Sequence, residues 1–245
     1  MQSRFEFRND QPVIILGHVF GTPIAIQGFS WLPVNQVFLW VLFTWRSLKK
    51  RPGWSWFQHL GLGGLRMLVF LGAEWCHNLA HTAAARLVGK PVDTIRIIAG
   101  MPVLIYNKPE HPSITPRQHL IRSLGGPVCN WVLLAVSHVF RRLTPAGSPA
   151  REVADTAVGM NTFIASASLL PVPVFDGGPV LKWSLIGRGV SPAKVEAVAA
   201  RTNQVLSAGL LGSAAMAAGK QRWLLALILV FLGSLSLAAG LGKME

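Results

Sequence analysis

Two histidines four residues apart, His77 and His81, are the residues of this chain best placed to do chemistry. They lie in a mostly apolar stretch, and a helix of about 3.6 residues per turn projects both from one face. Histidines with this spacing bind zinc in the pattern H-E-x-x-H, in which the glutamate is the general base. In this chain Asn78 occupies the position of that base. The five residues therefore predict a metal site with altered proton-transfer chemistry.

A carboxylate remains close to this pair, because Glu74 precedes His77 by about one helical turn. Side chains in a helix lean toward its N-terminus, so Glu74 leans away from His81. It is better placed to orient His77 than to replace the missing base, although that substitution stays open as a hypothesis. Ionisable groups in an apolar segment are costly and favour a functional interpretation. The alternative is that all three are polar residues packed against other helices.

A second polar position, Asp176, lies in the otherwise apolar stretch from Ser168 to Gly178. Gly177 and Gly178 follow it and allow another backbone to approach closely. Asp176 is therefore a candidate third zinc ligand, delivered from a different helix. Alternatively, its side-chain oxygen caps the helix that follows.

The composition indicates an α-helical integral membrane protein. Of 245 residues, 51% are hydrophobic and 13% are charged, whereas roughly 25% charged is typical of soluble domains. A membrane span needs about 20 apolar residues, and about six are predicted. The candidate spans are residues 28–46, 61–87, 121–141, 156–186, 203–219 and 222–241.

We expect a single membrane-embedded domain, 1–245, with three parts. Residues 1–28 form an interfacial or β segment, 61–186 the metal-site core, and 203–241 a C-terminal helix pair. Residues 12–28, rich in β-branched side chains and glycine, suit a short strand pair, and 92–106 suit a β-hairpin between helices.

The net charge of +13 comes from basic residues scattered between the apolar segments. This pattern favours contact with anionic lipid headgroups at the bilayer surface and argues against a nucleic-acid partner. The predicted protein is multi-pass. Lys and Arg are more numerous in the segments that share a side with both termini, which predicts cytoplasmic termini.

Four segments together resemble the site-2 protease (M50) family of intramembrane zinc metalloproteases. The resemblance covers nearly the whole chain, and its most specific part is the spacing of two prolines, an aspartate and two glycines in the last segment. The segments are Leu16–Ile24 (LGHVFGTPI), His77–His81 (HNLAH), Gly126–Asn130 (GPVCN) and Leu169–Gly178 (LLPVPVFDGG).

The resemblance implies a six-helix fold with one zinc ion bound by His77, His81 and Asp176. It implies supporting or substrate-contacting roles for Asn130, Ser168 and Gly177, with Ser168 standing where the family usually has asparagine. The implied substrates are transmembrane helices of other membrane proteins.

Asn78 leaves three functions open. The first is an intramembrane metalloprotease whose hydrolysis is impaired, because general-base catalysis is typically worth about 10²–10⁴-fold, or is rescued by Glu74 or another group. The second is a non-catalytic pseudoprotease scaffold that binds transmembrane partners. The third, a metal or ion transporter, also explains His and Asp in apolar segments, but the proline-rich motif argues against it.

Overall fold

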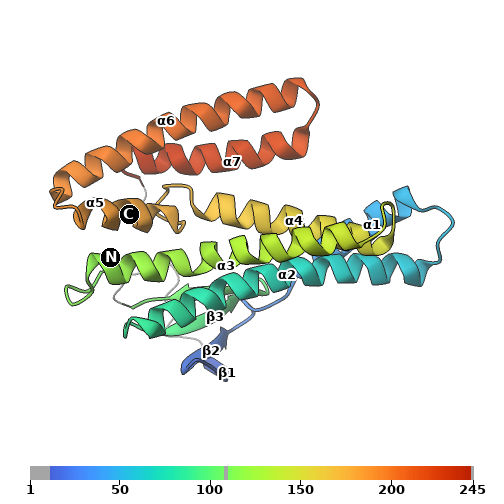
Figure 1. Ribbon diagram of the computed structural model, residues 1–245, viewed down its shortest axis with the longest axis horizontal. Helices are drawn as coiled ribbons and strands as arrows, with labels where there is room; N and C mark the ends of the chain where they lie inside the picture. The colour runs from blue at the N-terminus through green and yellow to red at the C-terminus, as the bar shows by residue number, and fades with distance from the viewer. Residues whose placement is uncertain (1–11, 108–109, 244–245) are drawn as a thin grey trace. The chain divides into compact units, whose positions relative to one another are not determined.

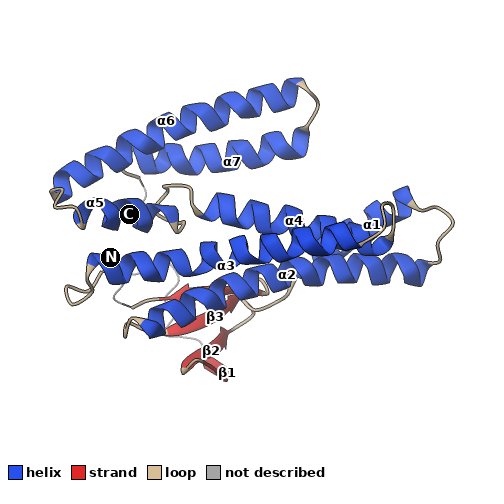
Figure 2. Ribbon diagram, in the orientation of Figure 1, coloured by secondary structure: helices blue, strands red, loops and turns tan. Residues whose placement is uncertain are grey.

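The computed structural model describes residues 12–107 and 110–243, which form two compact units. Figure 1 follows the chain, and Figure 2 distinguishes its helices from its strands. The first unit comprises the described residues of Met1–Ile114 and Gly125–Ala165, and the second those of Thr115–Leu124 and Ser166–Glu245. Part of the predicted segment 1–28, residues 1–11, lies outside the described residues.

The first unit contains a four-stranded sheet with the strand order β1-β2-β3-β4. Both hairpins expected from the sequence are confirmed, and β2 joins them by pairing in parallel with β3. Ala99 and Gly100, both at positive φ, form the turn of the second hairpin. The strands are β1 (Val13–Val19), β2 (Thr22–Gln27), β3 (Thr94–Ile98) and β4 (Met101–Ile105).

Helices make up the rest of the first unit. It holds α1 (Val34–Lys50), α2 (Trp56–Leu87), most of α3 (Pro116–Leu143) and most of α4 (Pro149–Ser168). A capping box begins α2. The Ser55 hydroxyl accepts from the Gln58 backbone N–H, and the Gln58 side-chain oxygen accepts from the Ser55 backbone N–H. Gly63 of α2 then lies against Thr44 of α1, a contact too close for a larger residue.

The second unit is built on a helix pair, α6 (Pro192–Gly219) and α7 (Trp223–Gly240), with the shorter α5 (Gly177–Ile186) beside α6. Buried serine hydroxyls join the pair: Ser207 of α6 donates to the Gly233 carbonyl of α7 at 2.9 Å. These bonds satisfy polar groups inside an apolar helix pair, so α6 and α7 have a defined register.

The predicted span 156–186 is not one helix, because α4 ends at Ser168 and α5 begins at Gly177. Pro171 and Pro173 in the intervening loop have no N–H to continue the helical ladder. Among the described residues, two helices, α3 and α7, are long and apolar enough to span a membrane. The mostly helical fold is confirmed, while the count of about six spans and the single domain stay predictions.

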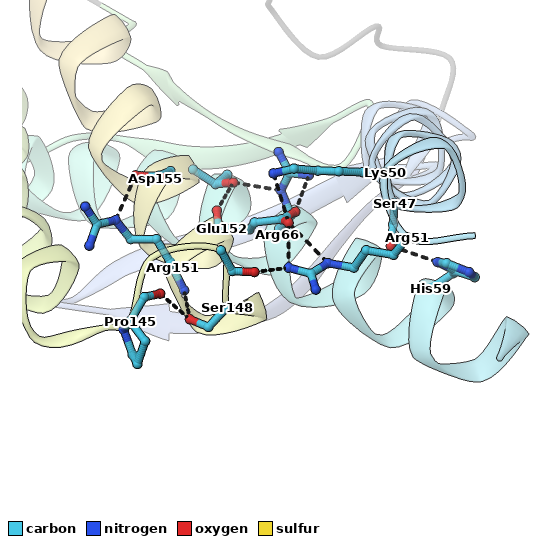
Figure 3. A network of polar contacts seen from close by, with 12 residues as sticks. Ser47, Lys50, Arg51, His59, Arg66, Pro145, Ser148, Arg151, Glu152 and Asp155 are labelled. Atoms are coloured by element: carbon cyan, nitrogen blue, oxygen red, sulfur yellow. Dashed lines mark hydrogen bonds and ion pairs between the residues drawn. The ribbon is translucent and has the colours of Figure 1, made fainter. Parts of the chain in front are cut away.

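A network of ion pairs fixes α4 against α1 and α2 (Figure 3). Glu152, buried near the start of α4, accepts from Arg51 at 2.9 Å and pairs with Lys50 at 3.0 Å. Arg66 of α2 lies 3.9 Å from the same carboxylate and donates to Thr156 at 2.8 Å. Burial alone would raise the pKa of Glu152, but the hydrogen bonds from Lys50 and Arg51 outweigh it and lower that pKa.

The variant Glu152→Gln is expected to lower the free energy of unfolding by about 1–3 kcal/mol, since it removes charged hydrogen bonds from a buried site. A lowered carboxyl pKa stabilises the fold above the unfolded-state value of about 4.3, and this stability is lost as the pH falls through the folded-state pKa. The difference between parent and variant should therefore shrink as the pH falls below about 4.

Denaturant unfolding in detergent micelles at pH 7 and pH 3.5 measures both effects. Asp155→Asn is the matched control, because Asp155 is half exposed and pairs with Arg141 at the surface, where such pairs contribute about 0–1 kcal/mol. Equal losses for the two variants at pH 7 would contradict the role given to Glu152.

Candidate metal centre

His77 and His81 converge on one point of the first unit. Both are buried, and their Nε2 atoms lie 3.1 Å apart. Two nitrogens bound to one tetrahedral zinc at 2.0–2.1 Å would be about 3.3–3.4 Å apart. The pair therefore has nearly the separation that a shared zinc ion requires, and the α2 spacing predicted from the sequence produces it.

Asn130 of α3 fixes the ring of His77. Its Oδ1 lies 2.6 Å from Nδ1 of His77, and its Nδ2 donates to Oδ1 of Asn161 on α4 at 2.9 Å. Asn161 in turn donates to the Ala157 carbonyl. Because the Asn130 oxygen can only accept, Nδ1 of His77 carries the proton and the Nε2 lone pair is available for a metal.

The second histidine is held differently. The Gly126 backbone N–H donates to Nδ1 of His81 at 3.3 Å, which places the proton of a neutral His81 ring on Nε2, facing His77. Zinc binding at that Nε2 requires the proton on Nδ1, so the Gly126 bond would be given up. It is longer than the 2.6 Å bond that orients His77, so its loss is the smaller cost.

Two glycines bring α3 close enough for these contacts. A Cβ on Gly126 would lie 2.6 Å from Cε1 of His77, and one on Gly125 would lie 2.8 Å from the Ala80 carbonyl oxygen. Real Cβ atoms do not approach this closely, so each position must lack a side chain. The sequence analysis identified the Gly126–Asn130 segment by resemblance, and its packing on α2 supplies the physical reason.

The Asn78 side chain is engaged with its own helix. Its Nδ2 donates to the Glu74 backbone carbonyl at 3.0 Å, and the backbone carbonyl of Asn78 accepts from the Thr82 hydroxyl at 2.9 Å. A carboxamide does not titrate near neutrality, so it cannot take a proton as a general base does. The role of the Glu74 carboxylate as a substitute base stays a prediction.

Ser168, Asp176 and Gly177 belong to the second unit, and their roles at a metal site stay predictions. Asp176 precedes α5 directly, yet its side chain makes no capping hydrogen bond, so the capping interpretation gains no support. A Cβ on Gly177 would clash with the Leu169 carbonyl. The Ser168 hydroxyl is buried and makes no hydrogen bond within the described residues.

One polar residue of the first unit was missed by the sequence analysis. Asn161 lies in an apolar predicted span, and a buried amide at that depth is itself a signal of a hydrogen-bonded partner. The spacing within one helix could not reveal that this partner is Asn130, since the contact joins α4 to α3.

Comparisons with known proteins find a curated relative and solved structures of similar fold, while no family model matches the chain. A protein of Methanocaldococcus jannaschii with the provisional name of a zinc metalloprotease is 27% identical over 180 residues, which cover 70% of this chain and 80% of that protein. The solved structure of a site-2 protease from the same organism matches with a TM-score of 0.52, 14% identity and 96% coverage of both chains. At that identity the structural match is evidence of the fold alone.

Asn130→Leu should weaken zinc binding about 10-fold to 100-fold, because His77 loses the acceptor that fixes its tautomer and ring orientation. Chelator competition on the detergent-solubilised protein measures the affinity. Ser137→Ala is the matched control on α3, since the Ser137 hydroxyl donates to the Leu133 carbonyl of its own helix. Parent-like affinity in Asn130→Leu would contradict the positioning role of Asn130.

Proposed function

We propose that this chain, which belongs to the site-2 protease family, binds one zinc ion and acts on transmembrane helices of membrane proteins, with hydrolysis impaired by Asn78. The observation that carries the proposal is the convergence of two buried Nε2 atoms at 3.1 Å, with His77 oriented through Asn130. The relative named as a zinc metalloprotease supports zinc as the metal.

In this proposal His77, His81 and Asp176 hold the zinc. Two neutral imidazoles and one carboxylate suit zinc, and three protein ligands leave a fourth position open. Bound zinc supplies Lewis-acid activation of water and of a peptide carbonyl. The chain's own residues orient His77 through Asn130, and Gly126 leaves room for the ligand pair. Ser168 and Gly177 are proposed to line the path of the substrate.

Proton transfer is the step that this site lacks. A glutamate at position 78 would accept a proton from the attacking water and pass it to the leaving amine. The Asn78 amide can hydrogen-bond but cannot move that proton. We therefore expect turnover to be lower by about 10²–10⁴-fold than with a carboxylate at this position.

A lipid bilayer is the proposed environment, with several spans and cytoplasmic termini. The two helices long and apolar enough to span it expose large side chains along their length, among them Val132 and Val136 of α3, and Leu227 and Phe231 of α7. Contiguous apolar surface of this kind is unfavourable in water and normal against lipid. Substrate or partner helices would reach the protein within the same layer.

A non-catalytic scaffold is the second candidate, and the geometry of Asn78 favours it. The Asn78 amide donates to the carbonyl of Glu74, so one of its two donors is used within its own helix and not on a reacting water. A pseudoprotease would keep the helix-binding and metal-binding features and release no products.

Purified protein in detergent should contain about one zinc per chain, and His77→Ala should contain none. Elemental analysis of both, after dialysis against a weak chelator, provides the measurement. His138→Ala is a matched control, since His138 is an exposed histidine that bonds to the carbonyl of Leu134 on its own helix. Zinc in equal amounts in all three proteins would show that the histidine pair is not the site.

Asn78→Glu separates the two candidate functions. If only the base is missing, this variant should raise turnover by about 10²–10⁴-fold, whereas Asn78→Gln, which keeps an amide, should stay at the parent level. Mass spectrometry of products from single-span membrane segments, reconstituted with each variant in vesicles, gives the rates. Zinc-loaded Asn78→Glu without products would leave the scaffold as the function.

A further inference from the structure

The loop that carries Asp176 is short of backbone donors that could anchor it. Pro171 and Pro173 have no N–H, and the loop's N–H groups at Val172 and Phe175 donate within the loop itself. Its carbonyls lie against the start of α5, where Gly177 faces the Leu169 carbonyl. These contacts fold the loop onto α5, but they do not attach it to the long helices of the second unit.

Asn203 of α6 supplies that attachment. It is 2% exposed, and its Nδ2 donates to the Pro171 carbonyl at 2.6 Å and to the Ala199 carbonyl of its own helix at 3.0 Å. Both amide hydrogens are thus used. The bond to Pro171 joins α6, the first helix of the C-terminal pair, to a point five residues before Asp176.

Ser236 of α7 fixes Asn203 in turn. Its hydroxyl, fully buried, lies 3.0 Å from Oδ1 of Asn203 and 2.9 Å from the Asn203 backbone oxygen. A serine hydroxyl donates one hydrogen, which these two oxygens share. With Oδ1 accepting, the orientation of the amide is set so that Nδ2 faces Pro171. The chain of contacts therefore runs from α7 through α6 to the loop.

We infer that Asn203, held by Ser236, is a positioning residue that fixes the 169–176 loop and thereby the Asp176 carboxylate for metal binding. The inference rests on the proposed function, in which Asp176 is a zinc ligand. It assigns the C-terminal helix pair a part in building the metal site, in addition to its place in the membrane. Asn203 acts through the loop backbone and does not itself touch the metal.

Asn203→Leu, similar in volume but without a donor, should weaken zinc binding about 10-fold to 100-fold, the usual effect of losing a group that orients a ligand. Ser236→Ala should weaken it in the same direction and by less. Ser207→Ala is the matched control, because it removes a buried bond between α6 and α7 one turn from Asn203 without touching the loop. It should bind zinc as the parent does.

The decisive comparison repeats Asn203→Leu in an Asp176→Ala background. If Asn203 acts by placing Asp176, Asn203→Leu has no further effect on zinc affinity once Asp176→Ala has removed the carboxylate. The visible absorption of bound Co²⁺, which reports the ligand set, should also change in Asn203→Leu and stay unchanged in Ser207→Ala. Amide exchange at Val172, Phe175 and Gly178 should be faster in Asn203→Leu than in the control.

Three outcomes overturn the inference in distinguishable ways. An equal loss of affinity from Asn203→Leu with and without Asp176 would mean a general structural effect. A loss from Asp176→Ala but none from Asn203→Leu would leave the proposed ligands standing and remove the positioning role alone. No loss from Asp176→Ala would mean that Asp176 is not a ligand, so that part of the proposed function would fail together with the inference.

Discussion

The close approach of α3 to α2 at Gly125 and Gly126 is the constraint on which the candidate metal centre depends. Gly126 faces His81, and Asn130, one turn later on the same face of α3, meets His77. Since His77 precedes His81 on α2, the two helices run in opposite directions in this register. A side chain at either glycine would push α3 outward and remove the Asn130 oxygen from hydrogen-bond distance. This packing therefore gives His77 the ring direction and tautomer that zinc binding needs, whereas His81 must give up its bond from Gly126.

The second unit uses the same physical device with different residues. Gly177 allows the loop carbonyl of Leu169 to approach α5, and an asparagine, Asn203, then fixes the loop by hydrogen bonding. A neutral amide suits both places, because burying an ion in apolar surroundings costs far more than burying a fully hydrogen-bonded amide. The charged network around Glu152 lies elsewhere, near the ends of α1 and α4, where Lys50 remains largely exposed.

The sequence contained enough information for the histidine pair and the two hairpins, because helical and strand periodicity depend on neighbouring residues alone. The comparisons likewise support the family resemblance found in four motifs, since a relative is named as a zinc metalloprotease and the fold matches that of a site-2 protease. The partners of Asn161 and Asn203 could not be predicted, since periodicity gives the face of a helix but not the register of the helix opposite. The predicted span 156–186 is longer than any helix in this region, because its hydrophobicity outweighs the helix break that Pro171 and Pro173 indicate.

The loss of the base and the integrity of the ligand pair are physically separable. The bonds between Asn130 and His77 and between Gly126 and His81 involve no side-chain atom of Asn78, whose amide donates to the helix that carries it. A glutamate at this position would make no bond to the Glu74 carbonyl as an anion and would add a second carboxylate one turn from Glu74. Asparagine is therefore the less costly residue at position 78, and a carboxylate there is a cost that a hydrolase accepts for its chemistry. A chain that keeps the ligand geometry without that cost has a site suited to holding zinc more than to turning over substrate.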